Sequence, residues 1–145
     1  MVKKKQEIDY GVMPLEGLWW MEDMTRFSID SKNKWKWTLL IMQPEYITQE
    51  MVHTAQEQAV KKKELPSIDK MRYQNFREGM AVQILHIGPF AAEGSTITKL
   101  HDFASLNGYT FDGRKQKHHE IYFNDPRRVN PEKMKTIIRQ PVVKA

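Results

Sequence analysis

GMAVQILHIGPF, residues 79–90, reads as a β-strand that ends abruptly at a turn. Apolar residues alternate along Gly79–Gly88, and the Gly88–Pro89 pair stops the strand because proline cannot donate a backbone hydrogen bond. A helix is predicted next, from about Gly94 to Asn107, and Gly108 fits the left-handed position that ends a helix. The buried stripe of this helix is expected to be Ile97, Leu100, Phe103 and Ala104.

Two further strands follow this helix. His118–Asn124 is the first and is stopped by Asp125–Pro126. The second runs from about Met134 to Val142, after Pro131. The second half of the chain therefore predicts the order strand, helix, strand, strand.

The first half reads as two strands followed by a helix. Leu15–Trp20 and Trp35–Met42 alternate as strands do, and the polar stretch Glu22–Lys34 between them is expected to be a loop. Thr48 is expected to cap a helix that runs to about Lys63, with lysines at the end that favours cations. The second strand is expected to place one apolar face mainly in the core, formed by Trp35, Trp37, Leu39 and Ile41.

The two halves share a short stretch of similar sequence. IMQP (41–44) resembles IRQP (138–141), and each half has one glutamate in the preceding strand, Glu16 and Glu120. If the halves are related, the first contains only its last two strands and lacks its leading strand and helix. We therefore interpret residues 1–145 as a single domain, with residues 1–64 as an incomplete first module plus a connecting helix and residues 65–145 as the second module.

Composition limits the classes of protein that fit. The 145 residues are 40% hydrophobic and 28% charged, which excludes a disordered or collagen-like chain. The longest apolar run, Leu39–Met42, is far too short to cross a membrane, and no apolar signal segment follows Lys3–Lys5. The absence of cysteine excludes disulfides and thiol catalysis and fits a cytoplasmic protein.

The net charge of +5 raises the expectation of an anionic partner. The cations are dispersed along the chain, however, and two of their clusters lie at a terminus or at the end of the predicted helix, where solvated lysines are ordinary. We therefore expect neither nucleic acid nor a membrane as partner. Nucleic-acid binding, if present, would weaken steeply with salt.

Glu120 is the first candidate functional residue. Alternation along His118–Asn124 places His118, Glu120 and Tyr122 on one face of the strand. A buried carboxylate is costly unless it is paired, so Glu120 either awaits a cationic or hydrogen-bonding ligand or forms a surface ion pair on an edge strand.

Aromatic residues are the second candidate feature. Trp19 and Trp20 are adjacent on a strand and must point to opposite faces, and Trp20 shares its face with Glu16 and Leu18. We therefore expect Trp20 to be a ligand wall, with Tyr122 stacking on the ligand or offering it a hydroxyl. An aromatic box with one carboxylate binds flat cations. His86 and Phe90, at the end of a strand, are expected at the rim, although a lone histidine there is more often structural.

Other chemistries lack their motifs. No zinc-type spacing such as HExxH or HxH occurs, so we expect no metal. No glycine-rich phosphate loop or GxSxG elbow occurs either, so we expect no cofactor and no acyl-transfer site.

Several motifs together resemble the stand-alone GyrI-like small-molecule-binding proteins, over essentially the whole chain. They are PLEGLWW (14–20), QPEYIT (43–48), VKKKELPSIDKMRYQNFREG (60–79), VQILHIGPF (82–90) and HHEIYFNDPRR (118–128). The resemblance implies an α+β fold, a twisted antiparallel sheet from two strand–helix–strand–strand modules with a ligand cleft between them. This chain departs from the pattern at its start, where the first module lacks its leading strand and helix. An open sheet edge and an uncovered apolar face would favour a homo-oligomer that completes the module.

The resemblance also implies a function. In the family, the glutamate that matches Glu120 lies at the bottom of the cleft and meets cationic, aromatic ligands. The expected ligand-binding residues are Glu120, Tyr122, Trp20, Glu16, His86, Phe90 and His118.

Two other functions remain open. Some stand-alone relatives are similar to hydrolases that open the cyclopropane of DNA-alkylating compounds, and in such an enzyme Glu120 would position or activate water and Tyr122 would orient the substrate. An interaction with a protein such as gyrase rests on analogy to the family's name-giving member alone.

Overall fold

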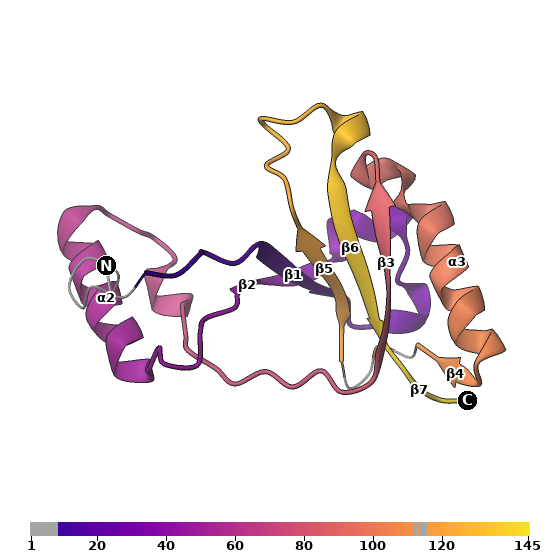
Figure 1. Cartoon of the computed structure of the whole chain (residues 1–145), viewed down its shortest axis with the longest axis horizontal. Coiled ribbons are helices and arrows are strands. Elements are labelled where there is room, and N and C mark those ends of the chain that lie inside the picture. The colour runs from indigo at the N-terminus through magenta and orange to yellow at the C-terminus, as the bar shows by residue number, and fades with distance from the viewer. Residues whose placement is uncertain (1–8, 112, 114–115) are drawn as a thin grey trace. The chain divides into compact units, whose positions relative to one another are not determined.

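The computed structural model of the chain describes residues 9–111, 113 and 116–145 (Figure 1). The described residues form two compact units. The smaller contains residues 9–13 and 42–77, and the larger contains residues 14–41 and 78–145. The boundaries of these units differ from the module boundary that the sequence indicated between residues 64 and 65. The single-domain organisation stays a prediction.

The larger unit is built on a five-stranded antiparallel sheet with the strand order β2-β1-β5-β6-β3. Its strands are β1 (Leu15–Trp20), β2 (Lys36–Ile41), β3 (Ala81–Ile87), β5 (His118–Tyr122) and β6 (Lys135–Pro141). The predicted α+β class with an antiparallel sheet is confirmed. A short ribbon of β4 (Tyr109–Thr110) and β7 (Val143–Lys144) was not predicted.

Helix α3 (Glu93–Leu106) packs alongside β3 on one face of this sheet (Figure 1). Leu100 and Ala104 are buried, together with Ile138 of β6. Gly108 follows the helix with a φ of 79°, as predicted for a left-handed C-terminal position. Phe103, expected in the buried stripe, is instead 57% exposed.

The register of the sheet determines which side chains share the helix face. Gly17 of β1 lies opposite Glu120 of β5, and Glu120 lies opposite Ile138 of β6. Residues directly opposite in an antiparallel pair point to the same side of the sheet. Glu120, with His118 and Tyr122 two residues away on either side, therefore lies on the face that α3 packs against.

Strand β2 differs from the expectation for a core strand. It is an edge strand, and Trp37, Leu39 and Ile41 are all exposed. Trp35 lies just before β2 and stacks on Phe27, with ring centroids 4.3 Å apart. The predicted loop before β2 contains two 3₁₀ helices, η1 (Met24–Arg26) and η2 (Ile29–Lys34).

The smaller unit contains helix α2 (Gln49–Lys62) and the short η3 (Ile68–Lys70). Thr48 caps α2 by accepting a hydrogen bond from the Met51 N–H, as the sequence predicts. The segment after the helix is held by the Tyr73 hydroxyl, which donates to the Ile47 carbonyl at 2.9 Å.

The face of the sheet opposite α3 carries a buried charged network. Its centre is His119, whose Nε2 lies 2.8 Å from Glu16 and whose Nδ1 lies 2.9 Å from Glu78. Arg139 donates to the other oxygen of Glu78. Burial alone would lower the pKa of His119, but the two carboxylates outweigh it and raise the pKa to about 9. His119 is therefore a cation between two anions at neutral pH.

This network predicts that stability falls in mild alkali. Because the folded-state pKa of His119 is raised above about 6.5, its contribution is full below pH 6.5 and is lost as the pH rises through about 9. We expect a loss of roughly 2–3 kcal/mol over this window, measured by urea denaturation at pH 6.5, 8 and 9.5. His119→Gln should give a flatter profile, and equal slopes for both proteins would contradict the prediction.

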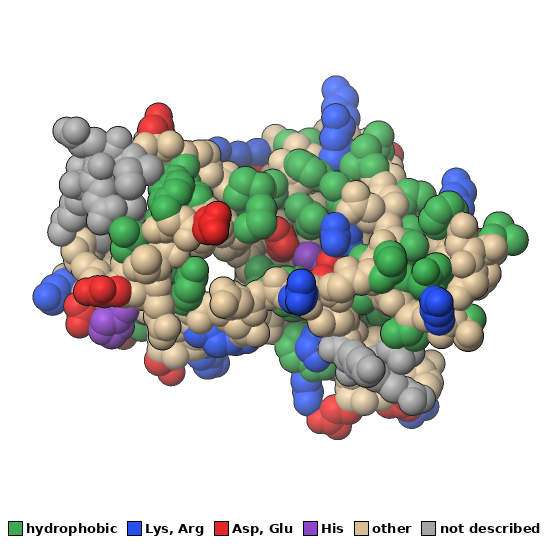
Figure 2. Space-filling model, turned by 60° about the horizontal axis from the view of Figure 1, so that its bottom comes forward, with side chains coloured by type: hydrophobic (Ala, Val, Ile, Leu, Met, Phe, Trp, Pro, Cys, Tyr) green, Lys and Arg blue, Asp and Glu red, His purple; other side chains and the backbone are tan. Residues whose placement is uncertain are grey.

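None of the helices among the described residues is long and apolar enough to span a membrane. Figure 2 shows the Lys and Arg side chains on one face as separate points among apolar and acidic side chains.

Candidate functional site

A pocket of about 650 Å³ opens in the larger unit on the helix side of the sheet. β1 contributes Trp19, β5 contributes Glu120 and Tyr122, and the region around the start of α3 contributes Phe90 and Glu93. This volume is in the range of pockets that bind small organic molecules.

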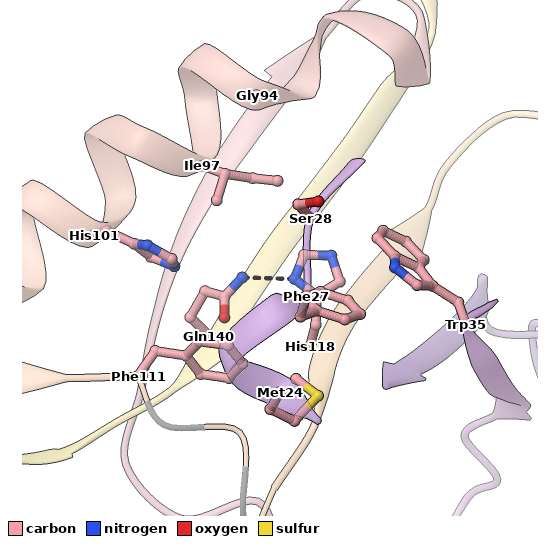
Figure 3. Close-up of a pocket in the computed structure, with 10 residues that line it drawn as sticks. All are labelled: Met24, Phe27, Ser28, Trp35, Gly94, Ile97, His101, Phe111, His118 and Gln140. Atoms are coloured by element: carbon pink, nitrogen blue, oxygen red, sulfur yellow. Dashed lines mark hydrogen bonds between the residues drawn. The ribbon is translucent and has the colours of Figure 1, made fainter. Parts of the chain in front are cut away.

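Glu120 forms the polar floor of the pocket and is only 5% exposed. Its Oε1 lies 2.7 Å from His118 Nε2, and its Oε2 accepts a 2.6 Å hydrogen bond from the Tyr122 hydroxyl. The Tyr122 oxygen in turn accepts a 2.8 Å hydrogen bond from the Trp19 indole N–H. Gln140 donates its amide N–H to His118 Nδ1 (Figure 3). His118 in this arrangement therefore presents an Nε2–H donor to Glu120.

This hydrogen bonding keeps Glu120 ionised. Burial alone would raise the pKa of Glu120, but the hydrogen bonds from His118 and Tyr122 outweigh it and lower the pKa below its ordinary value. Burial and the adjacent negative charge of Glu120 raise the pKa of Tyr122 well above its ordinary value, so Tyr122 stays a neutral hydrogen-bond donor.

A second carboxyl group, that of Glu93, faces the same pocket, and its pKa is shifted in the opposite direction. It is only 3% exposed, and its Oε1 is one of three buried side-chain polar atoms among the described residues that have no hydrogen-bond partner. Burial, reinforced by the charge of Glu120, raises the pKa of Glu93 to about 8. At neutral pH the pocket therefore holds one carboxylate and one mostly protonated carboxylic acid.

Aromatic rings form the apolar walls. Trp19 and Trp35 pack with ring centroids 5.9 Å apart, and Phe90 meets Tyr122 edge to face at 5.7 Å. The ammonium of Lys32 lies 5.6 Å from the Trp35 ring and also lines the pocket. Rings around a carboxylate provide both apolar contact and a negative potential, which suits flat cations.

Gly17 leaves room for this arrangement. A Cβ at Gly17 would lie 2.6 Å from the Trp19 indole nitrogen and 3.0 Å from the Tyr122 oxygen. We expect Gly17→Ala to break the Trp19–Tyr122 hydrogen bond and to lower the free energy of unfolding by about 1–3 kcal/mol. Urea denaturation followed by tryptophan fluorescence measures this effect. Gly11→Ala is the control, because nothing lies within 4 Å of a Cβ at Gly11; equal effects would contradict the prediction.

The residues predicted as a site do not all lie together. Glu120, Tyr122 and Phe90 line the pocket, and His118 lies beneath it, bonded to Glu120. Glu16 instead lies on the opposite face of the sheet, bonded to His119.

Trp20 and His86 also lie away from the pocket lining. The Trp20 ring lies 4.2 Å from the Lys117 ammonium. His86 is buried with both ring nitrogens engaged, by the Thr96 hydroxyl at 2.9 Å and the Pro89 carbonyl at 3.1 Å, so it fixes the turn between β3 and α3. The alternation of Trp19 and Trp20 was predicted, but Trp19 rather than Trp20 is the one in the pocket.

Sequence reasoning missed most of the pocket lining, including Trp19, Trp35 and Glu93. A signal for Trp19 was present, because Trp19 must face away from Glu16 on its strand, but which face meets Glu120 depends on register across strands. Glu93 lies in the first turn of a helix, where acidic residues ordinarily complement the helix dipole, so it carried no distinctive signal.

No group of three or more His, Asp or Glu side chains among the described residues is arranged to hold a metal ion. The Glu120 carboxylate, the Glu93 acid and the Tyr122 hydroxyl are groups that can form hydrogen bonds and transfer protons.

Comparison with known proteins identifies relatives of the chain. The family model described as the GyrI-like small molecule binding domain matches residues 2–143. An uncharacterised conserved protein from Listeria innocua is 42% identical with a TM-score of 0.85, over 99% of this chain and 72% of that one.

Two further similar structures are each described as a hydrolase from Listeria innocua. They are 39% and 41% identical, with TM-scores of 0.78 and 0.79, over 98% of this chain and 71% and 72% of those chains. No curated protein sequence is significantly similar to the chain. The match over nearly the whole length shows that this chain belongs to the GyrI-like family of small-molecule-binding domains.

Proposed function

We propose that the pocket above Glu120 captures a small, planar, cationic aromatic molecule. The observation that carries this proposal is the pair of buried carboxyl groups among aromatic rings, in which Glu120 is ionised and Glu93 Oε1 lacks a hydrogen-bond partner. A buried acceptor without a partner is costly, and a ligand that approaches with an N–H or a positive charge relieves that cost.

The charges around the pocket favour a cation. The two basic side chains in the lining differ, because Arg127 is already paired with Asp125 at 2.8 Å, whereas Lys32 lies against the Trp35 ring. Neither forms a salt bridge with Glu120, whose partner at salt-bridge distance among the described residues is His118, held as an Nε2–H donor by Gln140. The negative charge of Glu120 therefore remains available to a ligand.

A matched pair of probes tests this proposal. 10-Methylacridinium is a planar permanent cation, and 9-methylacridine has nearly the same shape without a charge at pH 8. We expect the cation to bind at least tenfold more tightly, measured by quenching of tryptophan fluorescence, because Trp19 and Trp35 line the pocket. Equal affinity for the two probes would contradict a charge-selective pocket.

A second candidate function is hydrolysis of cyclopropane-containing DNA-alkylating compounds. The observation that favours it is that the pKa values of Glu93 and Glu120 are shifted in opposite directions. Glu93 has a pKa of about 8 and retains a proton that it can donate, whereas Glu120 is ionised and can act as a base. Two similar structures are described as hydrolases. In this reaction Glu120 accepts a proton from a water whose oxygen bonds to the ring methylene as the carbon–carbon bond breaks, and Glu93 donates its proton to the electron pair released. A proton returned from Glu120 to Glu93 through solvent then restores both groups.

Mass spectrometry distinguishes an enzyme that converts the compound from a protein that only binds it. An enzyme converts an excess of a cyclopropane compound to a product heavier by one water, and Glu120→Gln abolishes that conversion. A binding protein binds one equivalent of the compound per chain and leaves it chemically unchanged.

Self-association and a cytoplasmic location stay predictions from the sequence.

A further inference from the structure

A second pocket of about 280 Å³ lies in the larger unit, and it is distinct from the one above Glu120. Among the described residues, Trp35 alone lines both. Figure 3 shows Phe27, Phe111 and Met24 around one side of the smaller pocket, with Ile97 and His101 of α3 on the other. Its lining is therefore mostly apolar and aromatic.

The smaller pocket contains a buried acceptor without a partner. Gln140 is only 1% exposed, and its amide N–H is committed to His118 Nδ1. Its carbonyl oxygen Oε1 has no hydrogen-bond partner. His101 is close enough for Gln140 to partly oppose the lowering of the His101 pKa, but no hydrogen bond of ordinary geometry reaches that oxygen. Leaving a carbonyl unpaired in apolar surroundings costs roughly 1–3 kcal/mol, so the pocket favours a guest that donates a hydrogen bond.

The charge state of the lining limits the guest further. Among the described residues, no Asp, Glu, Lys or Arg lines this pocket, and burial lowers the pKa of His101, which keeps its ring uncharged at neutral pH. A charged molecule would find no counter-ion among these described residues, in contrast to the pocket above Glu120. The volume exceeds the roughly 150 Å³ of an apolar cavity that accepts benzene, so a two-ring molecule fits.

We propose that this smaller pocket is a second binding site, for an uncharged two-ring aromatic molecule that donates one O–H or N–H to Gln140 Oε1. Phe27, Trp35 and Phe111 provide ring contacts, and Met24 provides a flexible apolar wall. The site goes beyond the proposed function, because it uses neither Glu120 nor Glu93.

The test compares 2-naphthol with 2-methoxynaphthalene, which has the same ring system but no donor. We expect 2-naphthol to bind at least tenfold more tightly. Methyl NMR of Met24 and Ile97 locates the site, since ring currents shift both signals, and both line only this pocket. Equal affinity of the two probes, or shifts at Leu15 of the larger pocket instead, would overturn the proposal.

Two variants test where 2-naphthol binds without relying on the comparison of the two probes. Ile97→Phe fills the pocket and should weaken 2-naphthol at least tenfold. Leu106→Phe is the same kind of change on the same helix at a position that is 87% exposed, and it should leave binding within twofold. A saturating amount of 10-methylacridinium should not displace 2-naphthol. Displacement would overturn the second site, whereas failure of the cation alone to bind would count only against the proposed function.

Discussion

Replacing Glu120 with glutamine is expected to weaken binding of 10-methylacridinium by roughly 10- to 100-fold. The change removes the negative charge that hydrogen bonds from His118 and Tyr122 maintain. It leaves the local packing intact, because a glutamine carbonyl can still accept from His118 and its amide can donate to the Tyr122 oxygen. Isothermal titration at pH 8 measures the effect.

Glu16→Gln is the matched control for this prediction. Glu16 is also a glutamate on a central strand, and it is also bonded to a histidine, but it lies on the opposite face of the sheet. Its substitution should change stability through His119 while leaving affinity for the cation within twofold. If both variants weaken binding equally, Glu120 has no particular part in recognition.

Much of the fold was predictable because its signals are local. Alternation identified β1 within its observed bounds, the Gly88–Pro89 pair identified the end of β3, and Gly108 identified the end of α3. The β4–β7 ribbon was missed because strands of two residues have no period to detect. The apolar face of β2 was visible in the sequence, but a pattern does not reveal that β2 is an edge strand.

The site was less predictable, for a related reason. Glu120 and Tyr122 lie two residues apart on one strand, so their shared face follows from alternation alone. Choosing Trp19 over Trp20 requires knowing that Gly17 lies opposite Glu120, which is a contact between strands about 100 residues apart in sequence. Glu93 reaches the pocket only because β3 and α3 meet there.

Raising the pH from 7 to 9 is expected to strengthen binding of 10-methylacridinium about tenfold. Glu93 has a pKa of about 8, so it is mostly neutral at pH 7 and mostly ionised at pH 9. Glu120 is ionised throughout this range because its pKa is lowered. The pocket therefore gains a second negative charge. Fluorescence titrations at half-unit steps measure the profile.

Glu93→Gln should remove this rise and leave a flat profile. His119 also titrates near pH 9, but it remains in the variant, so any difference between the two profiles belongs to Glu93. A rise that persists in Glu93→Gln would contradict the assignment of the pH dependence to Glu93.

The stability of the Glu93→Gln variant offers a second measurement. Because the folded-state pKa of Glu93 is raised, its burial lowers stability progressively from about pH 4.5 to 8, so the variant should be more stable than the parent at pH 8 by at least about 1 kcal/mol.

The coupling between the proton and the cation must act in both directions. If ionised Glu93 favours the cation, the bound cation must lower the pKa of Glu93, and binding at pH 7.5 must release protons. Calorimetric titrations in phosphate and in Tris then give different apparent enthalpies, since the released protons ionise each buffer with its own heat. The difference should vanish in Glu93→Gln and persist in Glu16→Gln. Equal enthalpies in the two buffers for the parent protein would show that Glu93 does not meet the ligand.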